Sequence, residues 1–254
     1  MNDLPDRFIR IFFAQYLKYY QSEGQINKFG MKYEVRMPEI VITKDGSHSI
    51  YNQEFDEHYH SVFGAITESQ HVFIEAGLKQ CKNRHIRILE MGFGTGLNAY
   101  LTLAETNNSD ISVSYTGIEK YPLESTITES LNYESIVDPP RKGIFKFIHD
   151  SPWQQEIVIK PGFILKKLQC DMDEMVLVDE FDLVYFDAFA PEKQPELWTK
   201  DLFKQIFLAM RSNSILTTYS SKGIVRRNLT AAGFRVKKIS GPPKKHEMTR
   251  AYKS

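Results

Sequence analysis

The sequence has few cysteines and no long hydrophobic run. Its 254 residues include only Cys81 and Cys170, too few and too far apart for a disulfide framework or a cysteine-rich zinc site. The longest apolar stretches, such as residues 11–14, are far shorter than the ~20 residues that span a bilayer. Asp3 and Asp6 lie in an N-terminus that lacks the apolar core of a secretory signal. We therefore expect a protein of the reducing cytoplasm, with no metal and no membrane segment.

The overall composition is ordinary, but the charge is unevenly distributed. Hydrophobic residues make up 42% and charged residues 25% of the chain, which excludes a disordered or collagen-like protein. Residues 221–254 contain ten Lys or Arg and one acid, so the preceding part of this net-neutral chain is acidic. Such a basic segment is able to attract a polyanion such as RNA. It is equally able to cover a solvated edge and neutralise an acidic body, and charge alone leaves both interpretations open.

Apolar periodicity predicts strands that alternate with helices. The predicted elements are a helix within 1–30, a hairpin over 32–52 turning at Asp45-Gly46, a helix at 61–77, strands at 86–91, 111–119, 181–186 and 214–219, helices at 97–106, 196–210 and 223–232, a hairpin at 156–169, and an antiparallel pair at 234–239 and 248–252. Residues 122–156 read as partly helical.

This alternation predicts an α/β fold with a mostly parallel, doubly wound sheet and an antiparallel C-terminal strand. The uninterrupted apolar run at residues 183–186 is typical of a strand buried on both faces. We expect three segments: a helical extension at 1–30, a hairpin and helix at 31–80 packed on the core, and the core itself at 81–254.

The most informative motif is Glu90-Met91-Gly92-Phe93-Gly94-Thr95-Gly96, between a predicted strand and a predicted helix. Glycines at such a turn let backbone N–H groups approach a ligand closely. The spacing differs from the G-x-G-x-x-G of nicotinamide and flavin binders, and the chain has no P-loop motif. An acid followed by G-x-G-x-G is typical of class I (Rossmann-like) S-adenosylmethionine-dependent methyltransferases. A purely structural glycine turn is the alternative.

Two further acids follow predicted strands. Glu119 closes the second strand, where a carboxylate is able to accept hydrogen bonds from two ribose hydroxyls. Asp171 ends the next strand and is a candidate acceptor for an adenine amino group. An exposed strand-end acid is the alternative for Glu119, and Asp173 or Glu174 could replace Asp171.

The second motif, Asp187-Ala188-Phe189-Ala190-Pro191, follows the fourth core strand. Ligands of open α/β sheets bind at that edge. An amine attacks a methyl group through its lone pair, so a carboxylate that accepts its N–H aligns it and takes up the released proton. An adjacent aromatic ring is able to stack on a flat substrate. The alternative is a capping aspartate before a proline-containing loop. His58-Tyr59-His60 is a weak metal pattern without a third ligand, and lining a pocket or a turn suits it better.

Together these segments resemble the methyltransferase domain of the MnmC family of bifunctional tRNA-modifying enzymes. The resemblance covers roughly residues 40 to 252. It is carried by residues 44–51, 57–61 and 68–73, by the cofactor loop at 89–98, by the hallmark stretch at 187–199, and by 226–234 with 245–248. Gln194 and Leu197 depart from the hallmark pattern, and Cys170 replaces the usual Gly before Asp171.

The resemblance implies a reaction, a cofactor and a partner. The reaction is methylation of the primary amine of 5-aminomethyl-(2-thio)uridine at the tRNA wobble position, the cofactor is S-adenosyl-L-methionine, and the partner is tRNA. We expect a stand-alone form, a monomer without the flavin-dependent oxidase half. The alternatives are a methyltransferase acting on another amine or a small molecule, an aminopropyltransferase, and a non-catalytic RNA-binding scaffold. The intact acids and glycines argue against the scaffold.

We assign three sets of site residues on this basis. Those for catalysis are Asp187 and Phe189. Those for cofactor binding are Glu90, Gly92, Phe93, Gly94, Thr95, Gly96, Asn98, Glu119, Lys120, Asp171 and Asp187. Those for substrate or tRNA are His58, Tyr59, Lys193, Lys222, Arg226, Arg227, Lys244 and Lys245.

Overall fold

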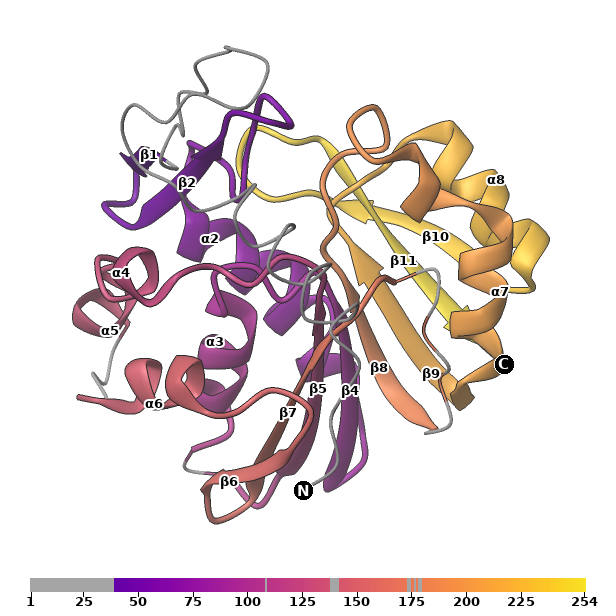
Figure 1. Cartoon of the computed structure of the whole chain (residues 1–254). Helices are drawn as coiled ribbons and strands as arrows, with labels where there is room; N and C mark the ends of the chain where they lie inside the picture. The colour runs from indigo at the N-terminus through magenta and orange to yellow at the C-terminus, as the bar shows by residue number, and fades with distance from the viewer. Residues whose placement is uncertain (1–38, 108, 138–141, 173–174, 176, 178–179) are drawn as a thin grey trace, which may run out of the picture. The chain divides into compact units, whose positions relative to one another are not determined.

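An eight-stranded sheet forms the centre of residues 40–254 in the computed structural model (Figure 1). The structure describes residues 39–107, 109–137, 142–172, 175, 177 and 180–254, so the helix expected within residues 1–30 lies outside the described residues. The strand order is β10-β11-β9-β8-β4-β5-β7-β6. The strands are β4 (His85–Met91), β5 (Ser112–Glu119), β6 (Glu156–Lys160), β7 (Phe163–Gln169), β8 (Phe181–Phe186), β9 (Met210–Thr218), β10 (Arg235–Ser240) and β11 (Glu247–Lys253).

The sheet is parallel at its centre and antiparallel at both borders. The strand β4 pairs in parallel with β5 and β8, and β7 and β9 extend the parallel part on either side. The strand β11 runs antiparallel to β9, and β6 runs antiparallel to β7. This arrangement confirms the predicted mostly parallel α/β sheet with an antiparallel C-terminal strand.

Helices cover both faces of the sheet because neighbouring strand residues point to opposite sides. On β4, Ile88 packs with the helix α3 (Leu97–Glu105), whereas the adjacent Leu89 packs with α7 (Lys200–Leu208) and α8 (Gly223–Ala232). The face with α3 also carries α4 (Ser125–Thr128), α5 (Tyr133–Ile136) and α6 (Ile144–Asp150), the helical parts expected within 122–156.

A separate three-stranded sheet precedes the main sheet. It consists of β1 (Glu39–Ile42), β2 (His48–Asn52) and β3 (Glu57–His58), followed by α2 (Ala65–Ser69), a π-helical stretch η1 (Gln70–Glu75) and a 3₁₀ turn η2 (Leu78–Gln80). The expected hairpin is present where the structure describes it, and β3 was not predicted because two residues carry no periodic signal. Asp45 fastens the turn to α2, accepting hydrogen bonds from the Thr67 backbone N (2.9 Å) and hydroxyl (2.8 Å).

One predicted helix begins later than expected. The prediction placed a helix at 196–210, but α7 starts at Lys200, after a short 3₁₀ turn η3 (Pro195–Trp198). Thr199 has an extended backbone and its hydroxyl accepts from Leu202 N at 3.3 Å, which makes it the N-cap of α7. The helix also ends early because β9 begins at Met210, four residues before the expected strand.

None of the helices in the described part of the chain has the length and apolar character that a membrane crossing requires.

We predict that Gly117→Ala destabilises the protein by about 1–3 kcal/mol, the usual cost of overpacking a core. A Cβ on Gly117 would lie 2.4 Å from Cδ2 of Phe93, whose ring is buried against β5. Denaturant unfolding measures the change. Gly223→Ala is the control, because a Cβ there meets only the flexible ends of Arg226 and Arg227 and should leave stability equal or slightly higher. Equal stability of the wild type and Gly117→Ala would contradict this packing.

Candidate active site at the carboxyl edge of the sheet

The carboxyl ends of three adjacent parallel strands bring the predicted motifs together. The register pairs Met91 at the end of β4 with Ile118 of β5 and with Phe186 of β8. The glycine-rich loop, Glu119 and Asp187, which follow or end these strands, therefore lie at one edge. Gly92, Gly94 and Gly96 all have positive φ (91°, 47° and 71°). A Cβ on Gly92 would lie 2.5 Å from the carbonyl oxygen of Asp187, so only glycine permits this close approach.

An amide joins two acids at the centre of the site. Asn98, in the first turn of α3, donates from Nδ2 to Glu90 Oε1 and to Asp187 Oδ2, both at 2.8 Å. Burial raises the pKa of Glu90 well above its usual value, and burial raises the pKa of Asp187 to about 7. The hydrogen bond from Asn98 opposes both shifts, because it favours the charged carboxylate. Within the described chain, Glu90 Oε2 and Asn98 Oδ1 are buried and take no close hydrogen bond, and the Tyr115 hydroxyl acts on Glu90 by lowering its pKa.

Glu119 is fixed by the glycine loop and by its own strand end. Its two carboxylate oxygens accept from Gly94 N and Tyr121 N, each at 2.9 Å. Burial raises its pKa, and the backbone hydrogen bonds act in the opposite direction. Beside it, Lys120 forms an ion pair with Asp171, so these two predicted cofactor residues neutralise each other. The Cys170 N–H donates to the Glu119 carbonyl at 3.2 Å, which ties the two strand ends together.

Two histidines hold the loop residue Thr95 from opposite sides. The Nε2 atom of the buried His60 lies 2.7 Å from the Thr95 hydroxyl, and Nε2 of His149 lies 3.0 Å from the Thr95 carbonyl oxygen. Burial lowers the pKa of each histidine to about 4, so both rings are neutral near pH 7. Neither histidine was predicted to contact the glycine-rich loop. His60 lies in a segment of the family resemblance, which was the available signal.

Aromatic rings cluster at the loop that follows Asp187. The Tyr59 ring meets Phe189 edge-on, with centroids 5.0 Å apart, and Phe55 lies 4.8 Å from Phe189. A Cβ on Gly94 would lie 3.1 Å from the Tyr59 ring, so Tyr59 reaches from the small sheet over the glycine loop. Glu57 of β3 accepts from Ala190 N at 3.0 Å, which fastens the loop after Asp187 to the same small sheet.

Several predicted site residues contact other side chains of the protein. The Phe93 ring packs into the core, and only its backbone belongs to the loop surface. The His58 ring lies 5.1 Å from Tyr51. Lys193 lies 3.4 Å from Asp56, and Lys222 forms an ion pair with Glu192.

The predicted tRNA residues of α8 and of the β10–β11 loop divide into two groups. Lys245 donates to Glu68 at 2.6 Å. Arg226 donates to the Ser221 carbonyl at 3.2 Å, whereas Arg227 and Lys244 make no ion pair with any described residue.

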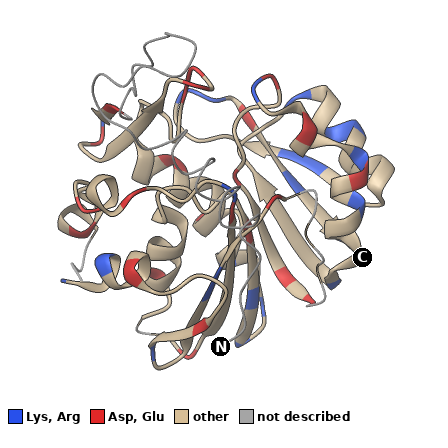
Figure 2. Cartoon of the chain, viewed as in Figure 1, with Lys and Arg blue, Asp and Glu red and all other residues tan. Residues whose placement is uncertain are grey.

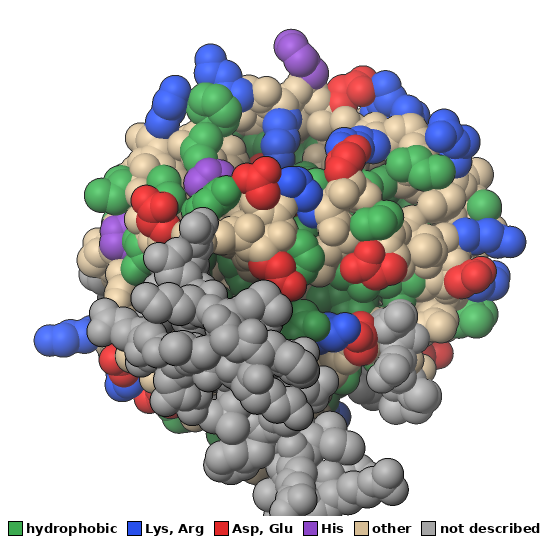
Figure 3. Space-filling view, turned by 45° about the horizontal axis from the view of Figure 1, so that its top comes forward, with side chains coloured by type: hydrophobic (Ala, Val, Ile, Leu, Met, Phe, Trp, Pro, Cys, Tyr) green, Lys and Arg blue, Asp and Glu red, His purple; other side chains and the backbone are tan. Residues whose placement is uncertain are grey.

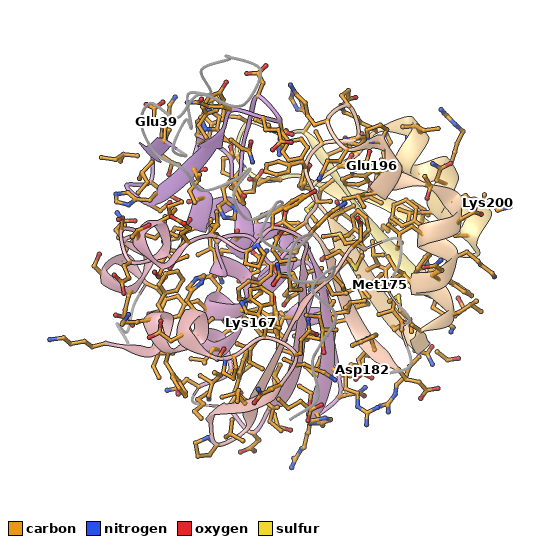
Figure 4. All side chains as sticks on the ribbon, in the orientation of Figure 1. Glu39, Lys167, Met175, Asp182, Glu196 and Lys200 are labelled. Atoms are coloured by element: carbon orange, nitrogen blue, oxygen red, sulfur yellow. The ribbon has the colours of Figure 1, made fainter. Side chains whose placement is uncertain are left out.

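A buried lysine, Lys167, is labelled in Figure 4. Lys167 of β7 donates to the His149 carbonyl at 2.6 Å and lies 4.8 Å from the centre of the Trp153 ring. Burial lowers its pKa to about 8. The inward position follows from strand alternation, because Phe163 and Leu165 point to the same side. Lys167, His149 and Gly94 line one small pocket beside the cofactor loop.

Comparison with known proteins identifies the family of this site. Residues 146–254 match the family model described as S-adenosyl-L-methionine-dependent methyltransferase. The tRNA 5-methylaminomethyl-2-thiouridine biosynthesis bifunctional protein MnmC of Marinomonas sp. (strain MWYL1) is 31% identical over 236 residues, covering 85% of this chain and 34% of that protein. The MnmC of Pseudomonas putida (strain W619) is 29% identical over 78% of this chain and 32% of its own length. The chain thus spans about a third of the length of these relatives.

A solved structure agrees over nearly the whole chain. The crystal structure of MNMC2 from Aquifex Aeolicus has a TM-score of 0.71 and 27% identity, covering 99% of this chain and 78% of that one. This chain is similar to the MnmC methyltransferases over most of its length. The predicted family and its cofactor, S-adenosyl-L-methionine, are thereby confirmed.

The residues at the edge of the sheet suit the cofactor of the MnmC family. S-Adenosyl-L-methionine carries positive charge and vicinal ribose hydroxyls. The site offers the carboxyl groups of Glu90 and Asp187 without a cation in contact among the described residues. Glu119 stands at the position of a ribose acceptor. We infer that Glu90, Glu119, Asp187 and the backbone of residues 92–96 hold the cofactor.

We predict that Asp187→Asn stabilises the protein at pH 8 by about 1–3 kcal/mol. Between pH 4 and 7 an unfolded chain has ionised Asp187, whereas the native state keeps the proton because its pKa is about 7. The native state then binds more protons, so its stability falls as the pH rises through this range. The asparagine has no such dependence, and the two proteins should converge near pH 4.

Denaturant unfolding at a series of pH values tests this expectation. Asp110→Asn, an exposed aspartate away from the site, is the control and should leave the pH dependence unchanged. A variant no more stable than the wild type at pH 8 would show that Asp187 is ionised at no cost in the folded protein.

Proposed function

We propose that this protein methylates the primary amine of 5-aminomethyl-(2-thio)uridine at the wobble position of tRNA, with S-adenosyl-L-methionine as methyl donor. The observation that carries the proposal is a half-buried carboxylate with one occupied and one available oxygen beside an aromatic pair. Asp187 Oδ2 accepts from Asn98, and Oδ1 takes no hydrogen bond from any described residue. Tyr59 and Phe189 contact each other at the loop that follows Asp187.

Asp187 would act as the acceptor of the amine proton. A methyl group is transferred to nitrogen only when the nitrogen lone pair is free, so an ammonium must first lose a proton. A carboxyl group with a pKa of about 7 is matched to that task near neutral pH, because its ionised form is available and still basic. The bound cofactor supplies the electrophilic methyl group. Asp187 then holds the N–H in line and passes the proton to solvent.

The acidic surroundings favour an amine over other acceptors. Glu57 and Glu68 stand in the same region as Asp187, on β3 and α2, and Glu68 raises the pKa of Asp187 through its charge. This field attracts a cationic amine and repels a carboxylate or phosphate acceptor. The aromatic rings offer a face for a nucleobase, since base–aromatic stacking is a common element of RNA recognition. The names of the MnmC relatives support the same nucleoside.

Basic side chains favour tRNA as the carrier of that nucleoside. Lys and Arg are concentrated on the side of the molecule that carries α8 and β10 (Figure 2). The space-filling view shows acidic side chains over the middle of one face, with many blue side chains towards its border (Figure 3). The α8 residues Arg226 and Arg227 follow Lys222, which is paired with Glu192 in the loop after Asp187. Phosphates held on this side would bring a neighbouring loop of RNA to the acidic centre.

The reaction is tested with tRNA that carries the aminomethyl group, and nucleoside mass spectrometry detects its gain of one methyl group. We predict that Asp187→Asn slows single-turnover transfer by ~10²-fold or more, the scale of a positioned proton acceptor. The wild-type rate should fall below about pH 7 as Asp187 becomes protonated. Asp110→Asn controls for the loss of one surface charge. The mechanism is refuted if methyl transfer is the rate-limiting step and its rate depends neither on pH nor on the Asp187 substitution.

We predict that the double reversal Arg226→Glu with Arg227→Glu weakens tRNA binding and lowers the slope of log affinity against log salt by roughly one per lost phosphate contact. Lys82→Glu with Arg84→Glu makes the same charge change just before β4, at the opposite edge of the sheet, and should have a much smaller effect. Binding is measured at several salt concentrations. Equal slopes for the two double variants would place the tRNA elsewhere.

A further inference from the structure

The loop between β10 and β11 reaches the region of Asp187 through one lysine. Lys245 Nζ donates to Glu68 Oε1 at 2.6 Å, and Glu68 Oε2 accepts from the backbone N of Ser61 at 2.8 Å. The Glu68 side chain is 11% exposed, and that of Lys245 39%. The pair thus closes a contact between residues 177 positions apart in the sequence.

A second contact of Lys245 leads to the residue after Asp187. The ammonium lies 4.4 Å from the centre of the Tyr219 ring, and the Tyr219 hydroxyl donates to the Ala188 carbonyl at 2.9 Å. The lysine, the ring and the strand-end loop form one continuous set of contacts. A cation over an aromatic face contributes about 0.5–1 kcal/mol when exposed, which helps to hold the lysine in this place.

The loop itself is shaped to present Lys245. The Lys245 N–H donates to the Pro242 carbonyl at 2.9 Å, and Gly241 N donates to the His246 carbonyl at 3.2 Å. A Cβ on Gly241 would lie 2.4 Å from the Lys245 carbonyl oxygen, so the loop can close this tightly only with glycine at that position. The neighbouring Lys244 has a left-handed backbone with φ of 71°. The position of Lys245 is therefore determined by the backbone as well as by its ion pair.

We propose that Glu68 and Lys245 are positioning residues that set the electrostatic environment of Asp187, and with it the pH range of methyl transfer. This inference rests on the proposed function. It also gives Lys245 a role different from the phosphate contact expected from the sequence, because its ammonium is already engaged with a carboxylate and a ring.

The direction of each charge effect on Asp187 follows from its sign. The negative charge of Glu68 raises the pKa of Asp187, and the positive charge of Lys245 lowers it. Burial raises the pKa further, and the Asn98 hydrogen bond lowers it. The other groups that interact with this carboxyl through charge are Glu90 on β4, Tyr115 on β5 and Tyr219 after β9. None of these belongs to the loop that carries Lys245, and Tyr219 is the one among them that Lys245 contacts.

A charge-deletion cycle tests the proposal through the pH dependence of single-turnover methyl transfer. Lys245→Met should move the acid limb of the profile to higher pH by ~0.3–1 unit, because Glu68 then acts on Asp187 without compensation. Glu68→Gln should move it to lower pH. The double variant, which lacks both charges, should return towards the wild type, and that return is a result which mere structural damage does not produce.

A matched ion pair in the same hairpin provides the control. Lys238 and Glu247 are 2.6 Å apart on β10 and β11, and both side chains are about as exposed as that of Lys245. Lys238→Met and Glu247→Gln should leave the acid limb in place. Thermal unfolding of every variant separates a loss of folded protein from a shift of the limb.

A direct measurement keeps the inference independent of the activity. The carboxyl carbon of Asp187, labelled with carbon-13 and assigned by its loss in Asp187→Asn, reports its titration without any substrate. If the wild type transfers no methyl group to the tRNA, the proposed function fails, whereas this titration still tests the effect of Lys245. Coincident Asp187 titrations in wild type, Lys245→Met and Glu68→Gln would overturn the inference. So would Lys245→Met lowering the tRNA salt slope while the limb stays fixed.

Discussion

The site depends on the amide of Asn98, which joins two buried acids. Glu90 and Asp187 come from adjacent parallel strands, and without a shared donor their charges would repel each other across a medium of low polarity. The amide satisfies one oxygen of each acid, and no described residue donates to the second oxygen of Asp187. Asn98 can do this because it lies in the first turn of α3, directly after the loop whose glycines bring the helix close to β8. The fold thus brings together two acids with raised pKa values, and a cationic ligand would favour their ionised forms.

Much of the fold follows from local patterns. The strands β4, β5 and β8 appear as apolar runs that end in acids or glycines, and parallel pairing brings those ends to one edge. Asp187 and Glu90 were accessible to sequence reasoning because each ends or follows such a run. The late start of α7 was also readable in principle, since Pro195 and Thr199 are ordinary signals for a turn and an N-cap. The helix was nevertheless predicted to begin at residue 196, because the helical spacing of apolar residues continues through this region.

The residues that hold the site in place were harder to predict from the sequence, because they come from distant parts of the chain. His60 and His149 meet at Thr95 from segments about ninety residues apart, and neither has a pattern that foretells the contact. The Tyr59 ring lies over Gly94 only because the small sheet folds back on the loop. The position of Lys167 could be predicted only in part. Alternation along β7 points it inward, and what it meets there depends on the end of α6.

The Lys and Arg residues of the basic C-terminal part have different roles, although they contribute equally to its net charge. Lys238 and Lys245 pair with acids, and Lys253 binds carbonyls at the end of α7, including that of Phe207 at 2.8 Å. These lysines behave as the neutralising interpretation expects. Arg227 has no ion pair within the described chain, and its neighbour Arg226 bonds only to a backbone carbonyl. A polyanion would gain most from such cations, because no acid has to be displaced. The two interpretations of the charge asymmetry therefore apply to different residues: the neutralising one to the ion-paired lysines, and the polyanion-binding one to Lys244 and the arginines of α8.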